Sequence, residues 1–356
     1  MALDLKDLGW DDDWSKAFAP YAADQLVPGR VAIEFNYIYR VFAESGELQA
    51  QHAGRLRHHA ESLSAVGDWV AVRPTPGEAT ATIEAILPRR SKFSRKVAGE
   101  LTEEQIVAAN IDTVFIVMGL DGDYNPRRLE RYLVLAYESG ARPVVILNKS
   151  DVADHLAEDI DEIQGLAVGI PVHAVSAREK DGIDVITGYL GPGRTGALLG
   201  SSGVGKSTLV NALLGEEKFK TKDVRAHDSR GRHTTRHRHL ILLPERRGLL
   251  VDTPGMRELQ LWSQGEGSRD TFEDILQLAQ GCHFTDCRHQ NEPRCAVKQA
   301  VEEGSLVADR LAGFQKLQGE LKTLEARKDV RAQIDAKKKI KSVSQSLKKL
   351  YKDREG

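Results

Sequence analysis

The chain has few cysteines, no long apolar run and almost no excess charge of either sign. It contains only three cysteines in 356 residues, and an odd number does not favour a disulfide framework. No apolar segment approaches the roughly 20 residues needed to cross a bilayer. The acidic N-terminus, with Asp11, Asp12 and Asp13, has neither signal-peptide nor transit-peptide character. We therefore expect a cytoplasmic protein with no membrane partner.

The near balance of charge limits the kind of nucleic-acid binding to expect. The formal net charge is -2, with 29% charged and 41% hydrophobic residues, which is ordinary for a soluble protein. Such a chain does not coat nucleic acid indiscriminately, so any RNA contact should come from local basic patches. The length is sufficient for two or three domains.

The residue pattern changes several times along the chain and predicts a multidomain protein. Short alternating apolar runs separated by turn residues predict a small barrel, and later alternating strands and helices predict an α/β domain. A helical pattern follows the cysteines. The expected division is an N-terminal extension (1–28), an OB-like RNA-binding β-barrel (29–96), an α/β domain (97–268), an α-helical cysteine-bearing domain (269–330) and a basic helical tail (331–356).

Basic residues in the barrel segment alternate with His58, His59 and Phe93, a mixture that suits an oligonucleotide-binding barrel. A β-domain with no such role remains open from composition alone. The lysine-rich tail is equally compatible with RNA contact and with a solvated helix. The basic residues in question are Arg55, Arg57, Arg89, Arg90, Lys92, Arg95 and Lys96.

A glycine-rich phosphate loop lies between an expected strand over 197–199 and an expected helix over 209–214. Its glycines allow backbone N–H groups to point at phosphates, and the following helix N-terminus favours negative charge. Lys206 should reach the β and γ phosphates, and Ser207 should ligate Mg²⁺. The nucleotide-binding residues expected here are Gly200, Ser201, Ser202, Gly203, Val204, Gly205, Lys206, Ser207 and Thr208.

The segment Asn148, Lys149, Ser150 and Asp151 identifies the base as guanine. The Asp151 carboxylate can accept bonds from guanine N1–H and N2–H₂, for which adenine has no counterpart. Asn148 orients the loop, and the stem of Lys149 covers the purine. Ser176 and Ala177 form a small-residue turn whose backbone N–H can meet guanine O6. The expected ligand is GTP or GDP.

The order of these motifs is the main indication of the type of protein. In an ordinary GTPase the phosphate loop precedes the guanine-reading segment, whereas here Asn148 precedes Gly200. The domain is therefore predicted to be a circularly permuted α/β P-loop GTPase. The segment from Asp252 to Gly255 follows another expected strand; Asp252 should hold Mg²⁺ through water, and the Gly255 N–H should contact the γ-phosphate.

Catalysis requires a polar group that the usual position does not supply. Met256 follows Gly255 where many GTPases have a water-orienting glutamine. His233, in the first-switch region, is the candidate for positioning water, with packing or RNA contact as the alternative. Either neighbouring threonine could bind Mg²⁺ and sense the γ-phosphate. The residues expected to act in catalysis are His233, Lys206, Thr234, Thr235 and Gly255, with Ser207 and Thr235 on magnesium.

All three cysteines lie in one short segment with a histidine among them: Cys282, Cys287, His289 and Cys295. A Cys₃His set is typical of a closed structural zinc site. We expect one zinc ion per chain, and His283 is a weaker ligand candidate. A module this small is expected to need the metal to fold.

Together these segments resemble the circularly permuted, small-ribosomal-subunit-dependent GTPases of bacterial ribosome biogenesis. The resemblance covers about residues 29–330 and rests on NKSD, GSSGVGKST, GRHTT, DTPGMRE and CHFTDCRHQNEPRC. It implies a protein that binds the 30S subunit and its rRNA, assists late 30S maturation near the decoding region, and hydrolyses GTP faster on the subunit. It also supports His233 as a catalytic candidate.

Several points stay open. Gly203 stands where relatives with potassium-assisted hydrolysis have Asn, so potassium dependence is undecided, and no family role extends to the acidic N-terminus or the lysine-rich tail. We expect a monomer whose zinc module follows the γ-phosphate-sensing switch and can move with it. The alternatives are an RNA-binding scaffold with a weak or vestigial GTPase, and a translation regulator on mature ribosomes.

Overall fold

The computed structural model describes residues 3–54, 56, 63–96, 104–122, 124–217, 238–252, 271–308, 310–323 and 326. The chain forms two compact units, each considered by itself. The first comprises residues 1–95, 106–260 and 265–271, and the second comprises 96–105, 261–264 and 272–356. No helix within the described ranges combines the length and the apolar character that a membrane span requires.

The first unit begins with a closed five-stranded barrel, which confirms the barrel predicted from the alternating runs. Closure follows because β1 pairs antiparallel with both β2 and β4, while β3 pairs with β2 and β5. Tyr39, Val41, Val70, Val72 and Ile83 fill its interior. The strands are β1 (Val27–Phe35), β2 (Ile38–Ala43), β3 (Gly46–His52), β4 (Trp69–Pro74) and β5 (Thr80–Ile86).

The α/β part of this unit is a sheet in the order β10-β9-β8-β11-β13-β12, in which only β12 runs antiparallel to its neighbour. The central strands β8 and β11 are buried along their whole length, as parallel strands between helices must be, whereas β10 at the edge of the sheet is only partly buried. The strands are β8 (Thr113–Gly119), β9 (Arg142–Asn148), β10 (Val172–Val175), β11 (Thr195–Leu199), β12 (Arg238–Leu242) and β13 (Leu249–Asp252).

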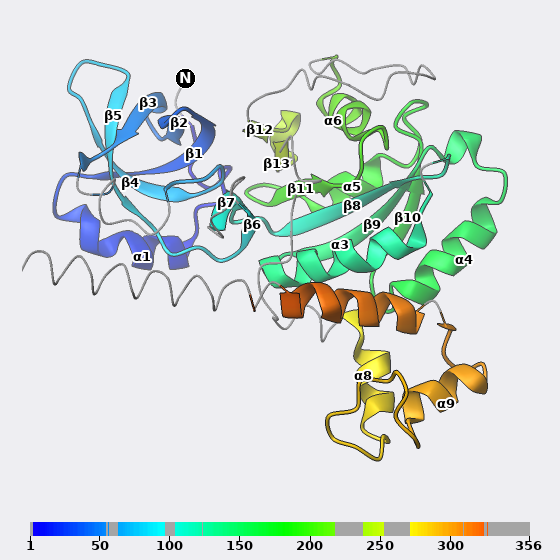
Figure 1. The fold of residues 1–356 in the computed structure, drawn as a ribbon. Coiled ribbons are helices and arrows are strands. Elements are labelled where there is room, and N and C mark those ends of the chain that lie inside the picture. The colour runs from blue at the N-terminus through cyan, green and yellow to red at the C-terminus, as the bar shows by residue number, and fades with distance from the viewer. Residues whose placement is uncertain are drawn as a thin grey trace, which may run out of the picture. The chain divides into compact units, whose positions relative to one another are not determined.

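Helices cover both faces of this sheet (Figure 1). Two of them, α3 (Pro126–Ser139) and α4 (Leu156–Leu166), pack against β9 and β10 on one face. On the other face, α5 (Asp184–Tyr189) and α6 (Lys206–Leu214) share one apolar core with Phe115 and Ile146. The helix α3 begins at Pro126, capped by Asn125, and ends at Gly140, which has a φ of 82°.

One strand pair joins the barrel to the α/β sheet. Barrel strand β1 pairs antiparallel with β12, with Ile33 opposite His239 and Glu34 opposite Arg238. The guanidinium of Arg238 also lies 3.3 Å from the Glu34 carboxylate. The two sheets thereby form one continuous 11-stranded sheet.

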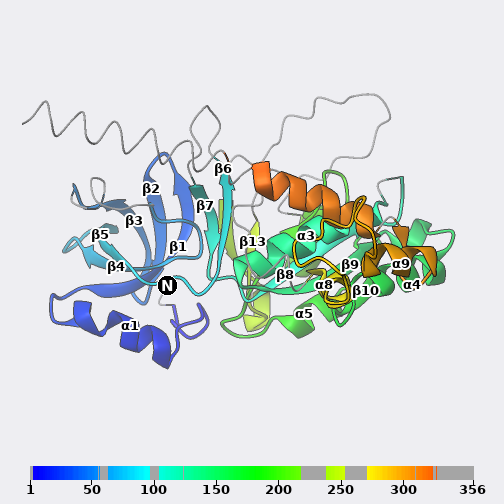
Figure 2. The ribbon, with the colours of Figure 1, turned by 60° about the horizontal axis from the view of Figure 1, so that its bottom comes forward.

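The N-terminal extension is ordered around α1 (Asp12–Ala22), which is capped by the Asp11 side chain. Figure 2 shows α1 lying along the barrel strands. Its buried Trp14 has the Arg90 guanidinium 4.2 Å from its ring centroid, and Arg90 also pairs with Asp11 at 2.6 Å. Arg89, likewise grouped among the expected RNA-contact residues, pairs with buried Asp68 at 2.6 Å. Both arginines therefore form ion pairs within the unit, and Arg90 remains exposed, so the RNA contact expected from sequence stays a prediction.

The second unit contains α8 (Glu273–Ala279), α9 (Ala296–Glu302) and a helix through residues 310–323. Leu311, Phe314, Leu317 and Leu321 are buried along that helix, in agreement with the helical pattern expected after the cysteines.

A separate two-stranded sheet lies between the barrel and the α/β sheet in sequence. It is formed by β6 (Lys92–Lys96) and β7 (Glu104–Ala109).

Candidate functional site

The α/β sheet brings the predicted nucleotide-binding segments to one edge. Asn148 ends β9, Ser176 follows β10, Gly200 follows β11 and Asp252 ends β13. These strands are parallel, so their carboxyl ends meet at the same edge, where ligands bind in open α/β sheets.

Asn148 connects three of these segments. Its side-chain Nδ2 donates to the carbonyl of Val204 at 2.7 Å, and its Oδ1 accepts from the backbone N–H of Ala177 at 3.0 Å. The side chain is buried, so both polar ends are satisfied within the protein. Asn148 therefore fixes the distance between the base-reading turn and the phosphate loop.

The remaining base-reading side chains are held by neighbours. The Ser176 hydroxyl donates to the Asp151 carboxylate at 2.6 Å and accepts from the Glu179 backbone N–H at 3.1 Å. Asp151 is exposed, so the rest of its carboxylate is accessible to a ligand. The Lys149 ammonium forms an ion pair with Asp121, directly beyond the carboxyl end of β8. Sequence reasoning missed Asp121, although its position after a buried strand was the available signal.

The phosphate loop is shaped by glycines that have no room for a side chain. A Cβ on Gly200 would lie 2.4 Å from the carbonyl of Val117, and one on Gly205 would lie 2.2 Å from Nδ2 of Asn148. Gly205 has a φ of 94° and directly precedes α6. The ammonium of Lys206 donates to the carbonyl of Gly200 at 2.8 Å and to that of Ser201.

The carboxylate of Asp252 lies close enough to the ammonium group of Lys206 for their charges to interact. Burial raises the pKa of Asp252, and the positive charge of Lys206 opposes that shift. A partly buried carboxylate near an ammonium group is a suitable environment for a hydrated Mg²⁺ beside phosphates. Several predicted residues lie outside the described ranges: His233, Thr234, Thr235 and Gly255, together with Met256.

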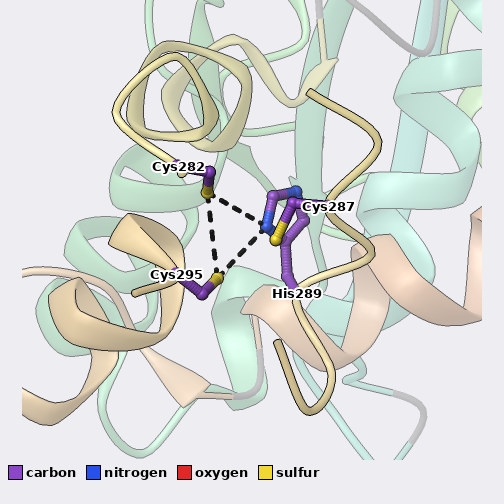
Figure 3. Close-up of side chains that lie close together, drawn as sticks. All are labelled: Cys282, Cys287, His289 and Cys295. Atoms are coloured by element: carbon purple, nitrogen blue, oxygen red, sulfur yellow. Dashed lines mark hydrogen bonds between the residues drawn. The ribbon is translucent and has the colours of Figure 1, made fainter. Parts of the chain in front are cut away.

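The second unit brings the cysteines and the histidine into one cluster (Figure 3). The ligand atoms of Cys282, Cys287, His289 and Cys295 all lie within 4.8 Å of one another. Cys282 Sγ lies 3.9 Å from Cys295 Sγ and 3.6 Å from His289 Nδ1, and Nδ1 lies 3.4 Å from Cys295 Sγ. Tetrahedral zinc bonds give edges of about 3.8 Å between two sulfurs and about 3.6 Å between sulfur and nitrogen. The cluster can hold one metal ion.

Local structure prepares these ligands. Burial lowers the pKa of His289, which favours the neutral ring that binds metals. Burial raises the pKa of Cys282, but hydrogen bonds from the Val297 and Ala296 backbone N–H groups outweigh it, so the net pKa is lowered. Gln315 donates to the His289 carbonyl at 2.6 Å, which ties the ligand loop to the helix through residues 310–323.

The loop between the ligands is also ordered by a carboxylate. Glu292 accepts from the backbone N–H groups of Arg288, Gln290 and Asn291 at 2.8–3.0 Å. These hydrogen bonds lower the pKa of Glu292 to about 2. The four ligands in the cluster do not include His283, the weaker candidate from sequence.

The guanine-reading segment precedes the phosphate loop on a six-stranded sheet. This sheet follows a barrel and precedes a Cys₃His cluster in the chain, and the arrangement defines a circularly permuted P-loop GTPase.

Comparison with known proteins leads to the same class of protein. The RsgA GTPase family model matches residues 86–262. The small ribosomal subunit biogenesis GTPase RsgA of Opitutus terrae is 45% identical over 353 residues, covering 95% of this chain and 96% of the relative. That of Syntrophotalea carbinolica is 40% identical, covering 98% of both.

Solved structures show the same fold. YjeQ from Thermotoga maritima superposes with a TM-score of 0.61 at 26% identity, over 83% of this chain and 98% of that one. YloQ, described as a circularly permuted GTPase, superposes with a TM-score of 0.59 at 24% identity, over 84% and 96%. The chain belongs to the RsgA GTPase family and is a GTP-hydrolysing enzyme.

Proposed function

We propose that this GTPase binds the small ribosomal subunit, assists its late maturation, and hydrolyses GTP faster when bound to it. The single observation that carries the proposal is near full-length similarity, 45% identity over 95% of the chain, to a relative named as a small ribosomal subunit biogenesis GTPase. Acting on ribosomal subunits, the protein would work in the cytoplasm, and we expect it to act as a monomer.

The proposed roles at the nucleotide site follow the chemistry of each residue. Asp151 reads guanine, Lys206 binds the β and γ phosphates, and Ser207 with Asp252 holds Mg²⁺ directly or through water. Thr234 or Thr235 completes the magnesium site, and Gly255 senses the γ-phosphate. His233 positions the attacking water, because Met256 has no group that can do so.

The Cys₃His cluster is proposed to hold one structural zinc ion. A tetrahedral zinc ion held by all four donors has no open position for a reacting water, so the ion would supply folding energy only. The proposed domain boundaries are those expected from the sequence: 1–28, 29–96, 97–268, 269–330 and 331–356.

The barrel is the proposed rRNA-binding part. The hairpin between β1 and β2 exposes Phe35 (49%), Tyr37 (61%) and Ile38 (36%). Asn36 and Tyr37 have φ values of 48° and 65°, as a two-residue hairpin turn requires. Exposed aromatic side chains on such a loop of an OB-like barrel can stack on unpaired bases.

The test is GTP turnover by the purified chain, alone and with 30S, 50S or 70S particles. We expect slow turnover alone and a rise only with 30S subunits. Turnover that no particle changes would favour a scaffold with a vestigial site. A larger rise with mature than with immature 30S subunits would favour a translation regulator, whereas a larger rise with immature subunits supports the proposal.

A further inference from the structure

A polar cavity lies at the edge of the α/β sheet opposite the nucleotide-binding edge. It has a volume of about 240 Å³ and is lined by the N-terminal segment, the barrel and the α/β sheet. Ile111 and Asp112 precede β8, and Gly193 and Arg194 precede β11, so the cavity lies at the amino ends of these strands. It is therefore distinct from the site formed at their carboxyl ends.

One of the residues that line this cavity is Arg30, a buried cation without a direct ion pair among the described residues. It is only 2% exposed. Its guanidinium donates to three carbonyls: those of Leu8, of Gly67 at 3.3 Å and of Asn110 at 3.0 Å. A guanidinium has five N–H donors, so two have no acceptor among the described residues. The ring of Trp69 lies 5.6 Å from the guanidinium carbon.

The nearby carboxylates are committed to other arginines. Asp68 is paired with Arg89 at 2.6 Å, and Asp112 is paired with Arg194 at 2.9 Å and also accepts from the Thr195 backbone N–H. Burial lowers the pKa of Arg30 to about 10, despite the favourable charges of Asp112 and Asp68. Neither carboxylate pairs directly with Arg30, and a buried charge without a direct ion pair is costly, so the position of Arg30 favours an anionic ligand.

The charges of the side chains that line the cavity also favour an anionic ligand. Four cations (Lys6, Arg30, Arg90 and Arg194) and two carboxylates (Asp11 and Asp112) line it, so four minus two leaves a net charge of +2. The pairs Arg90–Asp11 and Arg194–Asp112 cancel, which leaves Arg30 and Lys6. Lys6 is exposed.

We propose that this cavity is a second anion site, which binds a phosphate group carried by inorganic phosphate or by a small phosphomonoester. A tetrahedral dianion matches the net charge, and its oxygens can accept from the two remaining N–H groups of Arg30. Because residues of the N-terminal segment, the barrel and the α/β sheet all line the cavity, the bound anion stabilises the junction between them.

The site can be tested by intrinsic fluorescence, since Trp10, Trp14 and Trp69 line the cavity. The fourth tryptophan, Trp262, is replaced in a Trp262→Phe background that must retain GDP binding. The full-length protein, saturated with GDP to cover the nucleotide site, is titrated with inorganic phosphate and with ribose 5-phosphate, against chloride at equal ionic strength. A saturable change with either phosphate, absent with chloride, is expected. Tighter binding of one ligand identifies the source of the phosphate.

Arg30→Met should weaken this binding about tenfold or more, since it removes a charge-assisted partner. The matched control is Arg142→Met, which removes an exposed arginine that does not line the cavity. If Arg30→Met does not fold, Lys6→Glu is used in its place. Lys6 is exposed, and reversing the charge of this side chain lowers the net charge of the cavity lining to zero. No saturable response in the parent protein, or an unchanged response in the folded Arg30 or Lys6 variant, would overturn the proposal.

Discussion

The side chain of Asn148 joins two loops that are 56 residues apart in sequence, since its Nδ2 donates to the Val204 carbonyl at 2.7 Å. Gly205 lies next to this contact, and a Cβ at position 205 would collide with Nδ2 of Asn148. This contact thus fixes the guanine-reading and phosphate-binding parts of the site to each other.

Gly205→Ala should destabilise the nucleotide-free protein more than Gly203→Ala. Both glycines have left-handed φ values, 94° and 83°, so both alanines carry similar backbone strain. Only the Cβ at position 205 meets a neighbour within 4 Å, Asn148. Displacing that amide leaves buried polar groups unsatisfied, which costs about 1–3 kcal/mol. The free energy of unfolding of both variants is measured with denaturant. Equal losses of this free energy in the two variants would show that the Asn148 contact contributes nothing to stability.

Asp151→Asn should reverse the base preference. The variant places an amide where guanine N–H groups need an acceptor, so GTP affinity should fall steeply and xanthosine triphosphate affinity should rise. The Ser176 hydroxyl can still donate to the remaining side-chain oxygen. Equilibrium binding of both nucleotides is the measurement, and unchanged affinities for both would contradict the assignment of Asp151.

Asp252→Asn should stabilise the nucleotide-free protein at neutral pH while it weakens binding of Mg²⁺–GTP. Burial raises the pKa of Asp252 above its ordinary value of 3.8. The folded protein therefore holds this proton more tightly, and unfolding free energy is lost as pH rises from about 3.8 through the raised pKa. The difference in unfolding free energy between variant and parent should grow across that pH range. A difference that does not depend on pH would contradict the raised pKa of Asp252.

Cys287→Ser should release one equivalent of zinc per chain and loosen the second unit. GTP affinity should stay near the parent value, since the nucleotide-binding residues belong to the first unit. Metal analysis of protein purified without chelator is the measurement. Asp286→Ser is the control, because Asp286 is next to the ligand but outside the cluster. Protein without stoichiometric zinc would refute the site.

His233→Ala should remove most of the stimulation of GTP hydrolysis by 30S subunits and leave GTP binding intact. A single water-positioning or general-base group contributes roughly 10²- to 10⁴-fold. Lys206→Ala should instead weaken GTP binding, because Lys206 is expected to contact the ground-state phosphates. Parent-like stimulated turnover in the His233 variant would place the catalytic group elsewhere and leave His233 with an RNA-contact role.

Much of the nucleotide site could be predicted from sequence because each motif follows a buried strand. A strand such as β9 is nearly all apolar, so its carboxyl end and the residue delivered there, Asn148, are visible in the local pattern. The Cys₃His cluster was predictable for a similar reason, since its four ligands lie within fourteen residues, 282–295.

Long-range partners could not be predicted in this way. The pairing of Glu34 with Arg238 joins the barrel to the α/β sheet across 204 positions, and no local pattern encodes it. Arg89 and Arg30 look like any other surface arginine in the sequence, yet one is paired with buried Asp68 and the other is itself buried. Burial of a charge depends on tertiary packing, which composition does not reveal.

Binding of this GTPase to the small ribosomal subunit is tested most directly by sedimentation. The purified chain is centrifuged with 30S, 50S and 70S particles in a non-hydrolysable GTP analogue and, separately, in GDP. We expect the chain to sediment with 30S particles in the analogue, much less in GDP, and not with 50S particles. Equal sedimentation with all particles, or none with 30S in the analogue, would contradict it.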